Sequence, residues 1–294
     1  MMHLVVCTAQ GIADTDYSIP AWTYAREQGH RVDFYKTDEV PEGVKPDALI
    51  GLSITQMDPV NRMCNKFPDV PLFSYCWDAY EWCFLEHRHK GYDYRAYVKQ
   101  LQKSEEVWVP SYCTGIRLKD WFGMDSYRVR SAIPYWEYDN VRDDGYVLCT
   151  LREIPDTKWG WFKQSCEELN IPHMMTEHTK SFSDYQDAVA GCRLLVSHCD
   201  ELSTGGLTLL EGYYLGKPSL LSDSPWHGGT DYLGDRATYF DHTDFEDFKL
   251  KLSEMYKSPP PVATDNQYYV VNGFKDYHIV KGMLERVQVY LDGV

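Results

Sequence analysis

The stretch E-L-S-T-G-G-L-T-L-L-E-G-Y-Y-L-G-K-P, residues 201–218, joins a loop of small residues to a helix. The amides that open this helix at Leu207 and Thr208 are expected to point at an anion, with the positive end of the helix dipole behind them. Glu211 lies one turn further on, where its carboxylate can accept two hydrogen bonds from a vicinal diol such as a ribose. Four small loop residues leave the backbone open to the phosphates: Ser203, Thr204, Gly205 and Gly206.

The rest of the chain repeats the order of strand, loop and helix. Gly216-Lys217-Pro218 ends the helix, and the apolar residues 219–221 read as a buried strand. Alternation of this kind predicts an α/β fold with parallel sheets covered by helices. Expected strands cover residues 4–8, 31–35, 48–52, 71–75, 106–110, 127–130, 146–150 and 194–197, and expected helices cover 20–28, 94–103, 114–121, 160–169 and 245–256.

The quoted stretch resembles the C-terminal domain of the retaining GT-B glycosyltransferases of the group 1 type. In that family a Glu, a glycine pair and a second Glu precede Gly-Lys-Pro and a strand that ends in Ser-Asp, and Ser222 and Asp223 match that ending. The family's second Glu, which holds the nucleotide ribose, falls on Glu211. The glycine pair, whose amides meet the diphosphate, falls on Gly205 and Gly206.

A second match concerns two cations. Arg152 and Lys158 follow the expected strand at 146–150, where the family has an Arg and a Lys that stabilise the leaving diphosphate in place of a metal ion. One position departs from the family. The first Glu, which lies close to the donor sugar, falls on Ser203, and Glu201 is the nearby carboxylate.

The first half of the chain offers weaker candidates. Gly11 follows the first strand, where relatives place glycines near the donor phosphates, although a simple turn explains it equally well. Asp78, within the aromatic segment 75–82, is a candidate to orient the acceptor hydroxyl, and dense packing is the alternative for the aromatic rings. Asp14-Thr15-Asp16 resembles a metal-binding D-x-D motif of another architecture, but its place in a loop favours a solvated turn, and we expect no metal site.

The resemblance implies two Rossmann-like domains that face each other across a cleft, with a C-terminal helix crossing back to the first. We expect an acceptor domain at residues 1–138, a nucleotide-sugar domain at 139–258 and a returning helical segment at 259–294. The implied reaction is metal-independent retaining transfer of a hexosyl group to an acceptor hydroxyl, without a cofactor. The expected donor is a nucleoside diphosphate sugar, UDP-linked.

The acceptor is left open by the sequence. A hydroxymethylated pyrimidine in DNA, as in phage DNA modification, is one option by analogy with transferases of this architecture. The basic run 87–90 fits it, whereas the formal net charge of −15 opposes it. A glycan, a lipid or a small molecule is the other. Alternative functions are a nucleotide-sugar epimerase of the same fold and a non-catalytic nucleotide-sugar-binding module, while a dinucleotide oxidoreductase is disfavoured because no G-x-G-x-x-G follows the first strand.

Composition agrees with a globular chain of two modest domains. The 294 residues are 44% hydrophobic and 15% aromatic, which is enough for two cores. Nine cysteines without a C-x-x-C pair indicate reduced thiols. No apolar run is long enough to cross a membrane and no signal peptide is evident, so we expect a cytoplasmic protein, in the host cytoplasm if the chain is phage-encoded.

Overall fold

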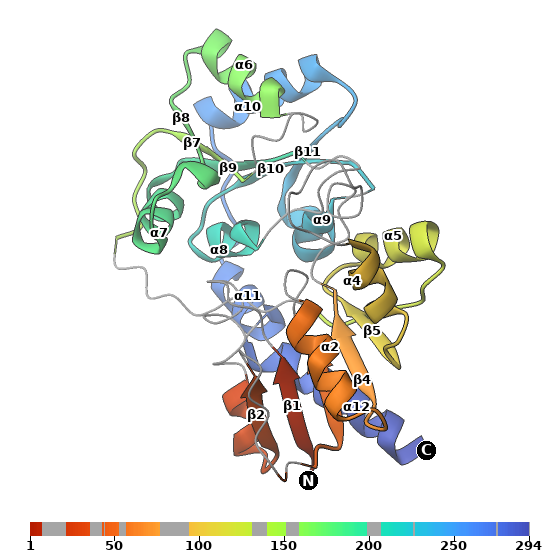
Figure 1. Cartoon of the computed structure of the whole chain (residues 1–294). Coiled ribbons are helices and arrows are strands. Elements are labelled where there is room, and N and C mark those ends of the chain that lie inside the picture. The colour runs from red at the N-terminus through yellow and green to blue at the C-terminus, as the bar shows by residue number, and fades with distance from the viewer. Residues whose placement is uncertain are drawn as a thin grey trace. The chain divides into compact units, whose positions relative to one another are not determined.

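The computed structural model describes residues 1–7, 22–35, 43, 45–52, 57–76, 94–130, 140–150, 159–198, 207–225, 227–274 and 276–293. Contacts between residues divide the chain into two units. The first unit contains Met1–Tyr135 and Phe274–Val294, and the second contains Trp136–Gly273. Each unit holds one parallel sheet with helices on both faces (Figure 1).

The sheet of the first unit has the strand order β2-β1-β3-β4-β5-β6, and every neighbouring pair of strands is parallel. Its strands are β1 (His3–Cys7), β2 (Arg31–Tyr35), β3 (Ala48–Gly51), β4 (Leu72–Tyr75), β5 (Glu106–Val109) and β6 (Tyr127–Arg128). Its helices are α2 (Met57–Lys66), α4 (Tyr94–Leu101), α5 (Tyr112–Phe122) and α12 (Asp276–Gly293), together with a helical segment at residues 22–27.

Strand β1 shows why its sequence is apolar throughout. Leu4 and Val6 lie in a core with Trp22 and the buried face of α12, whereas Val5 and Cys7 pack with α2 on the opposite face. Because successive side chains of a strand point to opposite faces, a strand buried on both sides reads as an unbroken apolar run. Five residues of α12 enter this core: Ile279, Val280, Met283, Leu284 and Val287.

The sheet of the second unit has the strand order β11-β10-β9-β7-β8, again with parallel neighbours. Its strands are β7 (Val147–Cys149), β8 (His173–Met175), β9 (Leu194–Ser197), β10 (Ser219–Ser222) and β11 (Thr238–Phe240). Its helices are α6 (Trp159–Leu169), α7 (Phe182–Gly191), α8 (Thr208–Tyr214), α9 (Gly228–Leu233), α10 (Phe245–Lys257) and α11 (Asn266–Phe274), with short 3-10 turns at Thr176–His178 and Gly234–Arg236.

The two faces of this second sheet carry different helices. Helices α6 and α10 cover one face, where Phe162 and Phe248 pack on Val147, Val196 and further residues of the core. Figure 1 shows α7 and α8 on the opposite side of this sheet. The predicted α/β class with two Rossmann-like domains is therefore confirmed.

The segment that follows α10 stays with the second unit as far as Gly273. Arg236 pairs with Asp265 at 2.8 Å, and the Asn266 side-chain amide donates to the carbonyls of Tyr213 and Tyr214 at the end of α8. These contacts hold the residues that follow α10 to the second unit, and the division by contacts falls after residues 135 and 273.

Candidate functional site

Three of the donor-site residues expected from the sequence lie in the described chain: Leu207, Thr208 and Glu211. The other expected site residues lie outside the described residues: Gly11, Asp78, Arg152, Lys158, Glu201, Ser203, Thr204, Gly205 and Gly206. The basic run 87–90 and the D-x-D at 14–16 also lie outside them. Residues 199–206 lead from β9 to α8, so the loop expected to hold the phosphates is bounded by two described elements.

Helix α8 begins where the sequence places it. Leu207 is its N-cap, and the Leu207 carbonyl accepts from the amides of Leu210 and Glu211 at 2.9 and 3.1 Å. Glu211 lies in the middle of the helix with 1% of its surface exposed. A carboxylate withdrawn from water to this degree needs hydrogen-bond donors from the protein or from a ligand.

One such donor comes from helix α7. The Tyr185 hydroxyl donates to Oε2 of Glu211 and lies 2.9 Å from Oγ1 of Thr208. In its ionised form the Glu211 carboxylate can only accept, so the single proton of the phenol belongs to that bond, and the Thr208 hydroxyl is then the donor to the Tyr185 oxygen. The three side chains form an ordered chain of hydrogen bonds between α7 and α8.

Gly212 explains how close α8 lies to the sheet. A Cβ atom added to Gly212 would lie 1.9 Å from Cδ1 and 3.2 Å from Cγ of Leu195, which is a fully buried residue of β9. A side chain at this position would therefore push the helix away from the strand. The glycine fixes the depth at which the preceding residue, Glu211, is held.

The C-terminal end of α8 follows the predicted pattern. Gly216 adopts a left-handed conformation with φ of 76°, and the Lys217 amide donates to the Gly212 carbonyl at 2.8 Å. Lys217 is 5% exposed, and its ammonium group donates to the main-chain carbonyls of Arg142 and Cys192. Burial lowers the pKa of this ammonium group. Lys217 is therefore a buried hydrogen-bond donor that links the chain after α8 to two main-chain carbonyls, and it is not a surface cation.

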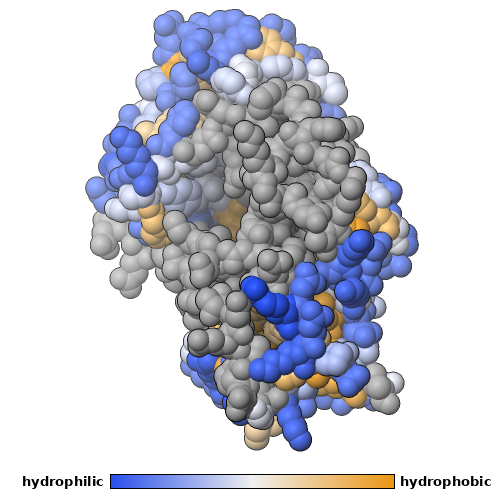
Figure 2. Space-filling model, in the orientation of Figure 1, coloured by the Kyte–Doolittle hydropathy of each residue, from blue (hydrophilic) through white to orange (hydrophobic). Residues whose placement is uncertain are grey.

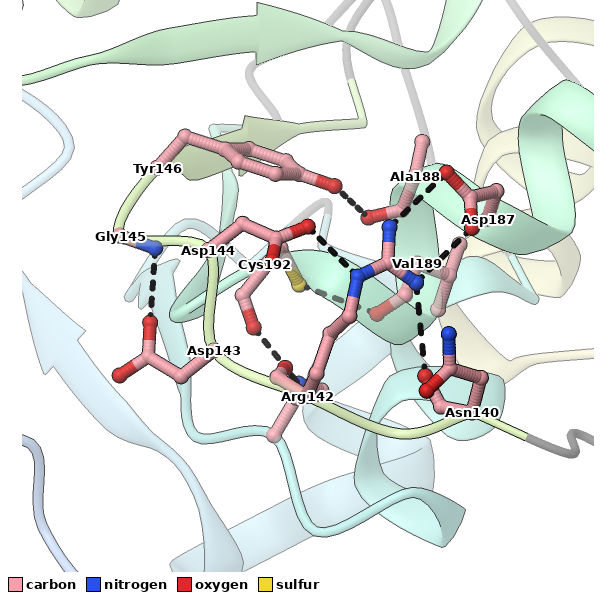
Figure 3. Close-up of polar contacts among 11 residues, drawn as sticks. Asn140, Arg142, Asp143, Asp144, Gly145, Tyr146, Asp187, Ala188, Val189 and Cys192 are labelled. Carbon is pink, nitrogen blue, oxygen red and sulfur yellow. Dashed lines mark hydrogen bonds and ion pairs between the residues drawn. The ribbon is translucent and has the colours of Figure 1, made fainter.

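The carbonyls that receive Lys217 belong to a polar cluster around Arg142 (Figure 3). The Arg142 guanidinium makes two parallel bonds to the Asp187 carboxylate, at 2.8 and 3.0 Å, and a third bond to Asp144 at 2.8 Å. This pairing raises the pKa of the guanidinium and lowers the pKa of the Asp187 carboxyl. Because Asp187 and Tyr185 are both on α7, the cluster also anchors the helix that carries Tyr185.

The end of α7 is closed by the same segment. The Tyr146 hydroxyl donates to the Ala188 carbonyl at 2.6 Å, as Figure 3 shows, and the Asp144 amide donates to the Gly191 carbonyl at 2.9 Å. A Cβ atom on Gly191 would lie 2.6 Å from the Asp144 carboxylate. Residues 140–146 thus fit against the last turn of α7 without room for a side chain at Gly191.

His227 is fully buried and caps helix α9. Its Nδ1 atom accepts from the Gly229 amide at 2.9 Å and caps α9, while Nε2 lies 3.1 Å from the Ser197 carbonyl at the end of β9. Both bonds require the neutral imidazole with its proton on Nε2. Burial lowers the pKa of this imidazole to about 4.

Metal ligation has one candidate among the described residues. Asp223, Asp241 and His242 bring their ligand atoms within 4.8 Å of one another at the carboxyl ends of β10 and β11. Asp223 accepts from the main-chain amide and from Nδ1 of His242, both at 2.9 Å, and Asp241 accepts from Thr243. These side chains are about one-third exposed or more, and Asp223 is already bonded to His242.

The surface of the described part of the chain is mainly hydrophilic in the view of Figure 2, with small hydrophobic areas scattered over it. Among the helices formed by described residues, none combines the length and the apolar character that crossing a bilayer requires. The seven described cysteines are free thiols, and six of them are buried: Cys7, Cys76, Cys113, Cys149, Cys166 and Cys192.

Sequence reasoning missed the residues that support Glu211. Tyr185 is 26 positions from its partner, and Lys217 reaches carbonyls that are 25 and 75 positions away. Local pattern carries no signal for contacts at such separations. The sequence does show a glycine inside the helix at Gly212, where the structure places the side chain of Leu195 against the backbone.

The two parallel sheets of Rossmann type and the placement of α12 in the first unit define a GT-B fold. No protein-family model and no curated protein sequence matches the chain. Solved structures resemble it over their whole length. A sucrose-phosphate synthase from Thermosynechococcus elongatus has a TM-score of 0.67 at 9% identity, with 100% of both chains covered.

Two further structures show the same similarity. A glycosyltransferase from Rickettsia africae ESF-5 has a TM-score of 0.68 at 9% identity, covering 100% of this chain and 99% of its own. HepE from Anabaena, solved in complex with UDP and glucose, has a TM-score of 0.66 at 9% identity, covering 98% of this chain and 100% of its own. At these identities the likeness establishes the fold and leaves the activity to be argued from the site.

Proposed function

We propose that this protein is a retaining glycosyltransferase that moves a hexosyl group from a UDP-linked sugar to an acceptor hydroxyl. The observation that carries the proposal is the buried carboxylate of Glu211, held on α8 directly after the small-residue loop. Its position in the GT-B fold corresponds to the sequence position at which the resembling family holds the nucleotide ribose. Several GT-B neighbours, including HepE, are solved with UDP, which makes UDP the first nucleotide to test.

The reaction assigns a role to each expected residue. Gly205 and Gly206, with the amides that open α8, receive the diphosphate, while Glu211 receives the ribose diol. Arg152 and Lys158 stabilise the charge on the leaving diphosphate, so the reaction proceeds without a metal ion. The acceptor hydroxyl attacks the face from which the nucleotide departs, and the departing phosphate takes its proton. Asp78 orients that hydroxyl.

The donor is tested by nucleotide release. The purified protein is incubated with UDP-, GDP- and ADP-linked sugars and a pool of acceptors, and the free nucleoside diphosphate is measured. Glu211→Ala is expected to lower kcat/KM by about two orders of magnitude or more, because several charge-assisted bonds are removed. Glu254→Ala, an exposed glutamate of α10, is the matched control and is expected to keep full activity. Full activity in Glu211→Ala would contradict the proposal.

The acceptor is tested by mass. DNA that contains hydroxymethylcytosine or hydroxymethyluracil is incubated with the protein and the active donor, and the nucleosides are analysed by mass spectrometry. A gain of one hexose establishes DNA as the acceptor. Release of nucleotide without that gain directs the search to glycans, lipids and small molecules. Conversion of the donor alone identifies an epimerase, and binding without release identifies a nucleotide-sugar-binding module.

A further inference from the structure

The hydroxyl of Tyr185 contacts the carboxylate of Glu211, the group proposed to bind the ribose of the donor. Tyr185 lies in the first turn of α7, half-buried, and donates to Oε2 of Glu211 from a helix other than the one that carries the glutamate. The bond is therefore a tertiary contact that sets the orientation of the carboxylate, because rotation of the Glu211 side chain would break it.

The phenol itself is held in place from several directions. Its ring stacks on Phe182, with the ring centroids 6.0 Å apart, and its oxygen lies 2.9 Å from Oγ1 of Thr208. Helix α7 is anchored beyond Tyr185 by the pairing of Asp187 with Arg142 and by the Tyr146 hydroxyl on the Ala188 carbonyl. The hydroxyl that donates to Glu211 thus belongs to a side chain with further contacts on Phe182 and Thr208.

A ribose diol presents two hydroxyls, and an ionised carboxylate accepts hydrogen bonds in its own plane. The plane in which those two hydroxyls must approach is set by the carboxylate plane, and Tyr185 fixes that plane before the nucleotide arrives.

We propose that Tyr185 is a positioning residue that makes the donor site selective for ribonucleotides over deoxyribonucleotides, by holding Glu211 ready for the ribose diol. This inference rests on the proposed function, because it takes Glu211 to be the group that receives the ribose. It adds a residue from a second helix and a defined chemical selectivity. The phenol is taken to act on the nucleotide through Glu211, so its effect must depend on the ribose hydroxyls.

The test compares nucleotides with and without the diol. UDP, GDP and ADP are first titrated into the protein by calorimetry, and the tightest is carried forward with its 2′,3′-dideoxy analogue. Tyr185→Phe removes only the hydroxyl. We expect it to weaken binding of the ribonucleotide about tenfold, which corresponds to about 1.4 kcal/mol, and to change binding of the dideoxy analogue less than about twofold.

Tyr146→Phe is the matched control. It removes the phenol oxygen that bonds the Ala188 carbonyl near the end of α7, whereas the bond to the Glu211 carboxylate comes from Tyr185. A general disturbance of α7 would weaken both nucleotides by the same factor in either variant. A selective loss for the ribonucleotide is expected in Tyr185→Phe alone.

Three results would overturn the inference, and they separate it from the proposed function. An equal loss for both nucleotides in Tyr185→Phe assigns the hydroxyl a purely structural role and leaves the donor site standing. Equal affinity of the unmodified protein for the ribonucleotide and its dideoxy analogue removes the ribose contact while donor binding stands. Failure of every nucleoside diphosphate to bind overturns the proposed function and this inference with it.

Discussion

The buried imidazole of His227 makes the stability of the second unit depend on pH. The folded protein lowers the pKa of His227 from 6.5 to about 4, chiefly by desolvation, with a smaller contribution from His198. Between these two values the unfolded chain binds a proton that the folded protein excludes. The contribution of neutral His227 to the free energy of unfolding is therefore complete above about pH 6.5, and it is lost as the pH falls towards 4. A difference of about 2.5 pKa units corresponds to roughly 3.4 kcal/mol in total, of which about 2 kcal/mol is lost by pH 5.

The perturbation is the replacement His227→Gln, which cannot titrate. The amide nitrogen of Gln can still donate towards the Ser197 carbonyl, but the cap on the Gly229 amide is lost. Loss of a cap costs about 1 kcal/mol, so the unmodified protein should be the more stable at pH 7 by about that amount. Its advantage should shrink on acidification and reverse between about pH 6 and pH 5, because only the unmodified protein loses stability through residue 227.

The assay is urea denaturation of both proteins at pH 7, 6 and 5. A chain of two units can unfold in two steps, so the transition of the second unit is followed by hydrogen-exchange mass spectrometry of peptides from β9 and β10. Taking the difference between the two proteins cancels the titration of all other groups. His227→Asn, which keeps a cap but shortens the reach to Ser197, should show the same slope. A difference that stays flat between pH 7 and pH 5 would refute the reasoning.

Three further expectations concern α8 and the metal candidate. Gly212→Ala should destabilise the protein by about 1–2 kcal/mol, because the collision of the new methyl group with Leu195 in a packed core costs more than the better helix propensity of Ala gains. Gly160→Ala in α6, where the added Cβ meets nothing within 4 Å, is the control and should be neutral or stabilising in the same urea titration. Lys217→Met should cost about 2 kcal/mol or more, measured in the same way, because two buried carbonyls lose their donor. EDTA and Asp223→Asn should each leave nucleotide release unchanged, whereas loss of activity in both would assign a metal to the cluster at Asp223.

The central strands of both sheets could be predicted from the sequence, and the edge strands of the second could not. Strand β9 matches the expected residues 194–197, because a parallel strand buried on both faces is a continuous apolar run. Strands β8 and β11 lie at the two edges of the second sheet, are only three residues long and are partly exposed. They carry no apolar run, so the sequence gives them no recognisable signal.

Helix α7 was missed for a related reason. Its buried residues are confined to its last turn, at Ala188, Val189, Ala190 and Gly191, so it lacks the apolar stripe of an amphipathic helix. The candidate site shows the same division. Local pattern and the family resemblance indicated Glu211, which stays a prediction, whereas Tyr185 could not be found without α7.

The closeness of α8 to the sheet and the burial of Glu211 are parts of one arrangement. Because Gly212 has no side chain, α8 packs against Leu195, and the neighbouring carboxylate is held in the interior with 1% of the residue exposed. A carboxylate there has already lost most of its water, and Tyr185 supplies a fixed donor in return. If Glu211 receives the ribose diol as proposed, little water has to be displaced and little side-chain entropy has to be lost when the two hydroxyls bind. The cost of desolvating and orienting the carboxylate is then met during folding, which leaves more of the energy of the new hydrogen bonds available for binding the nucleotide.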